Sequence, residues 1–153
     1  MKALFLAIVA LVLCSSYSSA HPDFKVPKLT VSAGVKFGYQ WSSNSGTFIG
    51  FELSTTVFHD KFFYGLVYNY DKTDYGTKSH FGVQMSGLYG GGEIGPSFIH
   101  TDSVTVVRAI GASVFTGLFI FPSYSLTIGE KNFYSHEANL LLKLHMPVEV
   151  ASN

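Results

Sequence analysis

The sequence predicts an all-β protein, an antiparallel up-and-down β-barrel of about eight strands. The first observation is a long alternation, because from Lys28 to Trp41 every second residue is apolar or aromatic and the residues between are polar, charged or glycine. Side chains alternate faces along a strand with a period of two, so this stretch predicts one two-faced strand. Two further observations are that the alternation recurs between turn-like segments and that no segment shows convincing helical periodicity.

Seven more segments follow the first strand and repeat its pattern. They run from Ile49 to Val57, Phe62 to Tyr70, His80 to Tyr89, Glu93 to Phe98, Val104 to Thr116, Gly117 to Ile128 and Glu137 to Met146. The longer connections are expected at the polar segments Ser42 to Gly46, Asp71 to Lys78, His100 to Ser103 and Gly129 to Ser135. Proline cannot donate to a sheet ladder, so a bulge or a break is expected at Pro96.

The run from Val104 to Phe121 has a second interpretation. Eighteen mostly apolar residues could also form a helix that crosses a membrane. Arg108 inside the run, its many Val, Ile, Thr and Phe residues and the strands on both sides favour two strands. A helix remains the alternative here.

The first twenty residues have the layout of a secretory signal. Lys2 precedes an apolar run from Ala3 to Cys14, and small residues stand at Ser18 and Ala20. The sequence therefore predicts a signal peptide over 1–20 and one domain over 21–153. Cys14 is the one cysteine of the chain, so the predicted domain contains no disulfide.

The composition points to a chain in contact with apolar surroundings. Its formal net charge is zero and charged residues make up 13%, against roughly a quarter in a typical soluble domain. Aromatic residues make up 16% and the mean hydropathy is +0.27. This composition gives no electrostatic basis for binding nucleic acid.

Alternation alone leaves open which face looks outward. A soluble barrel holds its apolar side chains inside around a ligand, whereas a membrane barrel presents them to lipid. Most charged residues of 21–153 fall in predicted turns, loops or termini, and only six lie on predicted strands. A soluble barrel would carry charges all along its outer face, so this distribution favours a membrane barrel whose interior holds the six. The predicted interior polar network is Lys36, Glu52, Glu93, Arg108, Glu137 and Lys143, three positive and three negative residues that can pair.

Aromatic residues near the strand ends provide independent support. A membrane barrel carries a belt of aromatic side chains at each interface. The predicted interfacial aromatics are Tyr39, Trp41, Tyr68 and Tyr70 near one set of strand ends and Phe58 and Phe62 near the other.

With this pattern the chain resembles the small eight-stranded outer-membrane barrels of Gram-negative bacteria. The resemblance rests on the pattern over 21–153 and on no diagnostic motif, and the chain ends MPVEVASN where many such proteins end on an aromatic residue. It implies location in the outer membrane, with both chain ends in the periplasm and the longer connections outside. The partners it implies are outer-membrane lipid, lipopolysaccharide and the barrel assembly machinery, with no specific protein partner.

Evidence for chemistry is confined to Ser135, His136 and Glu137. Some outer-membrane barrels that modify lipid A carry a His and a Ser near the outer end of a strand, where the base activates the hydroxyl. In the familiar deacylase pattern the Ser follows the His by two residues, but that position here is Ala138. No catalytic residue is therefore assigned, and these three remain the candidates.

Metal binding is the other chemistry that the sequence raises. The chain has six histidines, of which His80, His100 and His136 lie near the same predicted strand ends. They lack the short spacing of metal ligands, so the sequence predicts neither a metal site nor a cofactor.

The predicted function is an integral outer-membrane barrel with a filled polar lumen, acting as a structural or surface-exposed protein without catalysis. Two alternatives remain open at this point. One is an outer-membrane enzyme of lipid A acyl chemistry, and the other is a secreted soluble barrel of the lipocalin type that binds a hydrophobic ligand.

Overall fold

The computed structural model describes residues 29–42, 45–59, 62–87, 90–101, 104–117, 120–130 and 132–148. The predicted signal peptide over 1–20 lies outside the described residues. Within the described part, no helix is long and apolar enough to cross a membrane.

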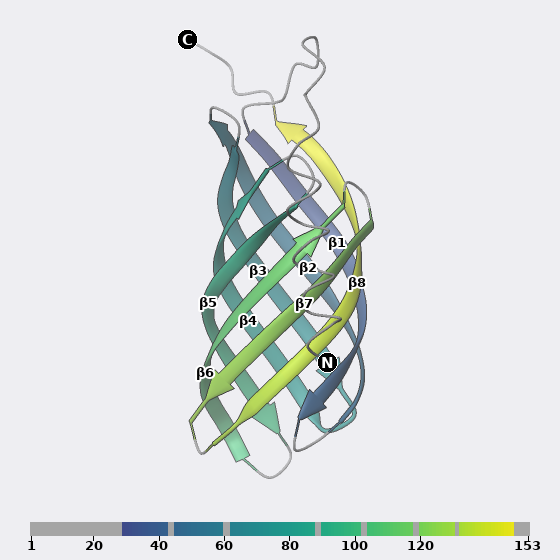
Figure 1. The fold of residues 1–153 in the computed structure, drawn as a ribbon, viewed down its shortest axis with the longest axis vertical. Coiled ribbons are helices and arrows are strands. Elements are labelled where there is room, and N and C mark those ends of the chain that lie inside the picture. The colour runs from purple at the N-terminus through teal and green to yellow at the C-terminus, as the bar shows by residue number, and fades with distance from the viewer. Residues whose placement is uncertain are drawn as a thin grey trace, which may run out of the picture.

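Eight antiparallel strands follow one another around a closed barrel in sequence order (Figure 1). The last strand pairs with the first from Leu29↔Val148 to Ser42↔Ser135, so the sheet has no open edge. The predicted fold class is confirmed. The strands are β1 (Leu29–Ser42), β2 (Gly46–His59), β3 (Phe62–Thr73), β4 (Gly76–Ser86), β5 (Gly90–Thr101), β6 (Val104–Thr116), β7 (Ile120–Gly129) and β8 (Tyr134–Val148).

The barrel has two distinguishable ends. At the end drawn uppermost in Figure 1, β1 begins and β8 ends; we call it the terminal end. The opposite end, which we call the far end, carries the connections over 43–45, 74–75, 102–103 and 130–133. Each described strand has 10 to 15 residues, enough for a tilted strand to cross a bilayer, which takes roughly 9 to 11.

The strands are staggered around the barrel. A path can be followed around the barrel from each residue to its register partner on the next strand. Starting at Val31 on β1, it passes through Leu66, Ile94 and Leu126 and returns to β1 at Trp41, ten residues after Val31. A closed sheet with such a stagger must tilt its strands against the barrel axis. A line of register partners therefore shifts steadily toward the far end as it passes from β1 to β8.

The distribution of apolar and polar side chains is inverted relative to a water-soluble protein. Along β2, Ile49 and Leu53 are about half exposed while Glu52 between them is 5% exposed. Among the described residues, 27 large hydrophobic side chains are exposed, and 17 of the 24 buried residues other than glycine are polar or charged. Residues of alternating character thus form the strands that the sequence predicts, with the apolar row outside and the polar row inside.

The apolar run over 104–121 forms parts of two strands. β6 ends at Thr116 and β7 begins at Ile120, which confirms the predicted split and excludes the helix. Gly117, directly after β6, has a φ of +124°, a backbone conformation that favours glycine.

Two local expectations were wrong. Asp71 to Lys78 is not a loop, because β3 continues to Thr73 and β4 starts at Gly76. The strand β5 is not broken at Pro96, which pairs with Ile110 of β6. The β4–β5 pairing keeps the same register on both sides of this position, and the register shift of β5 falls instead between Ile99 and Thr101.

Candidate functional site

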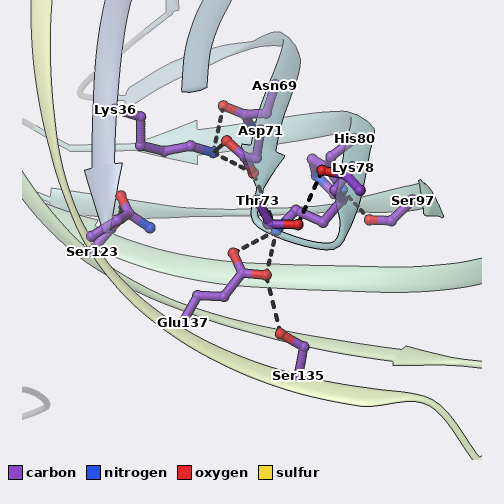
Figure 2. Close-up of polar contacts among 12 residues, drawn as sticks. Lys36, Asn69, Asp71, Thr73, Lys78, His80, Ser97, Ser123, Ser135 and Glu137 are labelled. Atoms are coloured by element: carbon purple, nitrogen blue, oxygen red, sulfur yellow. Dashed lines mark hydrogen bonds and ion pairs between the residues drawn. The ribbon is translucent and has the colours of Figure 1, made fainter. Parts of the chain in front are cut away.

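The lumen contains a network of buried ion pairs contributed by four strands. Lys36 on β1 places its Nζ 2.8 Å from Oδ1 and 3.0 Å from Oδ2 of Asp71 on β3. Lys78 on β4 places its Nζ 3.2 Å from Asp71 Oδ2 and forms a second ion pair with Glu137 on β8. Figure 2 shows Lys78 between the two carboxylates. These contacts join strands on opposite sides of the barrel.

Neutral polar side chains extend this network toward β5. The Lys36 ammonium donates to Asn69 Oδ1 at 3.3 Å, and the Asn69 amide donates to Glu93 Oε1 at 3.2 Å. His80 shares a hydrogen bond of 2.8 Å between its Nδ1 and the Ser97 hydroxyl, and its Nε2 lies 4.0 Å from Glu93 Oε1. Burial makes each unpaired charge costly, so mutual satisfaction is what permits this density of charges.

A separate ion pair lies nearer the terminal end. Lys143 on β8 pairs with Glu52 on β2, and both side chains are 7% exposed. The Lys143 ammonium also lies 5.8 Å from the centroid of the Phe121 ring. Because β1 separates β8 from β2 in the sheet, this pair spans the strand junction where the barrel closes.

Apolar and aromatic side chains fill the lumen around the polar groups. The Phe48 ring lies 5.8 Å from Lys36 Nζ and 5.9 Å from Lys78 Nζ. Toward the far end, Ile99, Val107 and Ala109 form a small buried cluster. The three cavities found between lumen side chains measure about 20 Å³ or less, room for little more than one water molecule.

Two interior glycines make room for the largest network groups. A Cβ built on Gly38 would lie 2.5 Å from the Phe48 ring, and one on Gly50 would collide with Asp71 Oδ1. Glycine at these two positions therefore leaves the space that Phe48 and Asp71 occupy in the narrow lumen.

Five of the six predicted network residues lie on the inner face. Lys36, Glu52, Glu137 and Lys143 are buried, and Glu93 lines two lumen cavities together with Lys36. The sixth assignment was wrong. Arg108 is exposed on the outer face and pairs across the ladder with the exposed Phe98. Val107 and Ala109 on either side of it point inward and are buried, so strand alternation forces Arg108 outward.

Sequence reasoning missed Asp71, Lys78 and His80 as members of the network. Asp71 and Lys78 were placed in a loop because Asp, Lys, Thr, Tyr and Gly are residues typical of turns. A usable signal was present, since the outward residues Tyr70 and Lys72 continue the alternation of β3 and place Asp71 on the inner face.

Five of the six predicted interfacial aromatics lie on the outer face, and one does not. Tyr39, Trp41, Phe62, Tyr68 and Tyr70 lie on the outer face, as the alternation of β1 and β3 requires. Phe58 instead shares the inner face of β2 with Glu52, and its ring lies 5.0 Å from that of Phe63. An apolar residue next to a turn gives no strong signal of its face, because lumen and lipid both accept it there.

The three catalytic candidates do not share one face of the barrel. Ser135 and Glu137 are buried in the lumen, where the hydroxyl donates to Glu137 Oε1 at 3.2 Å. His136 lies on the outer face, and its Nδ1 shares a 2.6 Å hydrogen bond with the Tyr124 hydroxyl. The wall of the barrel separates base from hydroxyl, and within the described ranges no three His, Cys, Asp or Glu residues group as metal ligands.

A closed eight-stranded barrel with an apolar exterior and a charged, filled lumen has the fold of the small outer-membrane barrels, as the sequence pattern predicted. Among solved structures, the chain is similar to Neisserial surface protein A, with a TM-score of 0.51 and 10% identity over 76% of this chain and 96% of that chain. It is also similar to the N-terminal β-barrel domain of OprF from Pseudomonas aeruginosa, with a TM-score of 0.47 and 12% identity over 74% of this chain and 97% of that chain. For Ail of Yersinia pestis the TM-score is 0.42, with 10% identity over 80% and 100% of the two chains.

No protein-family model matches the chain, and no curated protein matches its sequence. At 10 to 12% identity, the similarity to solved structures concerns the fold.

Proposed function

We propose that this chain is an integral outer-membrane protein that acts as a structural or surface-exposed barrel, without catalysis and without conducting solutes. The observation that carries the proposal is the inverted burial: 27 large hydrophobic side chains of the described residues are exposed, and ion pairs are buried inside. Full burial of one large apolar side chain is worth roughly 1.5 to 3 kcal/mol, so leaving this many of them about half exposed to water would be costly. The exterior therefore suits hydrocarbon.

The same inversion opposes a soluble lipocalin-like barrel. Such a barrel would line its interior with apolar side chains around a ligand, whereas the described interior holds Lys36, Asp71, Lys78 and Glu137 in mutual contact. Cavities of about 20 Å³ also leave no space for a hydrophobic ligand, since ligand pockets usually measure about 300 to 1,000 Å³. The side chains that fill the lumen would also block the passage of solutes through the barrel.

Location and partners form the second part of the proposal. A signal over 1–20 would export the chain, and the barrel assembly machinery would insert it into the outer membrane beside lipid and lipopolysaccharide. The terminal end would face the periplasm. Support comes from the closed antiparallel barrel, the strand lengths and the similarity in fold to Neisserial surface protein A.

The enzyme alternative finds no support in the arrangement of its candidates. A nucleophile and its base must lie within hydrogen-bond reach and face a common substrate. Ser135 and His136 occupy opposite faces of β8.

Membrane fractionation tests the proposal. The full chain is expressed in a Gram-negative host, and the outer-membrane fraction is run on a detergent gel with and without boiling. We expect recovery in the outer membrane and a change of mobility on heating. Recovery of the folded chain from the aqueous fraction without detergent would refute the proposal, and altered lipid A acyl chains in the expressing cells would contradict the absence of catalysis.

A further inference from the structure

The outer face of the barrel carries charge at two positions only, within the strands that the structure describes. Of the charged side chains on these strands, Lys72 and Arg108 face outward and all others face the lumen. Both outward charges are positive. Both lie near the far end, on β3 and β6.

The register gives the height of the two cations on the barrel. Followed back to β1, the register line of Arg108 reaches Val35 after five strands. The shift caused by strand tilt puts Arg108 about six residues closer to the far end than Val35, level with Trp41. The line of Lys72 reaches Phe37 after two strands, which puts Lys72 about level with Tyr39. Both cations therefore lie in the aromatic belt, where a bilayer changes from hydrocarbon to headgroups.

Small polar side chains lie between the two cations. On the outer face of β4, Thr77 pairs with Lys72 and Ser79 pairs with Phe98, which in turn pairs with Arg108. The surface formed by Lys72, Thr77, Ser79, Phe98 and Arg108 is called the polar arc below. It contrasts with the same height on β1 and β8, where Tyr39, Trp41 and Tyr134 face outward.

Two described acidic residues lie near the arc. Asp74 follows the end of β3, and Glu130 follows the end of β7, where its N–H donates to the Arg108 carbonyl at 2.9 Å. Both are exposed on connections of the far end. No ion pair between described residues engages Lys72 or Arg108, so their charges face the headgroup layer.

We propose that the polar arc binds the headgroup of a lipid that carries more than one phosphate group; this inference rests on the membrane location proposed above. The two cations stand three strands apart, which puts their backbones about 14 Å apart at roughly 4.8 Å per strand; with both side chains extended along the surface, each cation can contact a separate phosphate. A headgroup with two separated phosphates can contact Lys72 with one and Arg108 with the other. The hydroxyls of Thr77 and Ser79 then face the part of the headgroup that joins them.

The test measures lipid binding to the folded full-length barrel in detergent by native mass spectrometry. The probes are bisphosphorylated lipid A, monophosphorylated lipid A, fully dephosphorylated lipid A, phosphatidylglycerol and inorganic phosphate. We expect the bisphosphorylated probe to bind most tightly, and we expect Lys72→Gln with Arg108→Gln to weaken it about tenfold, the sum of two exposed charge contacts. The charge-preserving pair Lys72→Arg with Arg108→Lys should stay within about threefold of the parent.

Several outcomes would overturn the inference. Equal affinity for the dephosphorylated probe, or unchanged affinity of the Gln pair, would show that phosphate does not bind at the arc. Equal affinity for phosphatidylglycerol would refute a headgroup with two phosphates, and competition by inorganic phosphate alone would refute a lipid as the ligand.

Heat-modifiable migration of each variant confirms folding, and the single substitution Arg108→Gln replaces any pair that does not fold. A barrel that inserts but binds none of the probes refutes this inference and leaves the proposed function standing.

Discussion

Replacing Glu137 by Gln should destabilise the barrel strongly, because Lys78 would lose one of its two carboxylates. Asp71 would then face two ammonium groups, Lys36 at 2.8 Å and Lys78 at 3.2 Å. The side chain of Lys78 is 11% exposed and that of Glu137 is 1% exposed, so solvent screens the excess charge poorly. Breaking a buried pair by removal of one partner costs about 3 to 5 kcal/mol. We expect the lower end of this range, because the amide oxygen still accepts a hydrogen bond.

The second substitution Lys78→Met separates charge imbalance from lost packing. In the double variant Lys36 and Asp71 remain as a balanced pair, so it should be more stable than Glu137→Gln alone by at least about 1 kcal/mol. Asp74→Asn, an exposed acidic residue on a far-end connection, serves as the matched control and should change stability by less than about 0.5 kcal/mol.

The assay is equilibrium unfolding in lipid vesicles, monitored by the fluorescence of Trp41. This residue is the one tryptophan of the chain and is 47% exposed on the outer face, so its emission changes when it leaves the lipid interface. If the two substitutions add within about 0.5 kcal/mol, Lys78 and Glu137 are not coupled. That result would refute the cross-barrel network.

Three further predictions follow from the filled lumen. Gly38→Leu should cost about 1 to 3 kcal/mol by overpacking against Phe48, whereas Gly46→Ala, whose Cβ would meet no atom closer than 3.2 Å, should be nearly neutral in the same unfolding assay. Lys143→Met should lower the free energy of unfolding by about 3 to 5 kcal/mol because it leaves the buried Glu52 without its ion-pair partner. The substitution of the exposed Lys72 by Met should lower it by less than about 1 kcal/mol, and equal losses would contradict the inner position of Lys143. In planar bilayers the wild-type barrel should pass no steady ionic current, and a stable open current would show that the lumen is not filled.

The sequence predicted the architecture because strand alternation is a local property. Each outward row of apolar residues and each inward row of polar residues could be recognised within its own segment, as in Lys28 to Trp41. The face of the strand was ambiguous where both rows are apolar. In β6, Val107 and Ala109 point inward beside the outward Val106 and Ile110, so alternation gave no sign that Arg108 points outward.

The partners within the lumen could not be predicted in the same way. Lys78 pairs with Glu137 from across the barrel, and such a contact depends on the stagger of all eight strands. The sequence placed Lys36, Glu52, Glu93, Glu137 and Lys143 on the inner face but contained no local signal for which of them meet. Asp71 and Lys78 were not predicted to face the lumen for a different reason. Their segment has the composition of a turn, and this was given more weight than the alternation that continues to the end of the strand.

The most direct test of the central claim is the membrane insertion of single arginine substitutions at different heights of the outer face. Val35 and Leu142 are register partners on β1 and β8, 45% and 46% exposed, and lie mid-strand on the apolar exterior. Arginine there should cost about 2 to 4 kcal/mol and block insertion, whereas Val106→Arg, two residues beyond the outward Arg108, should cost about 0 to 1 kcal/mol and insert. Full insertion of both Val35→Arg and Leu142→Arg would contradict an exterior that faces lipid.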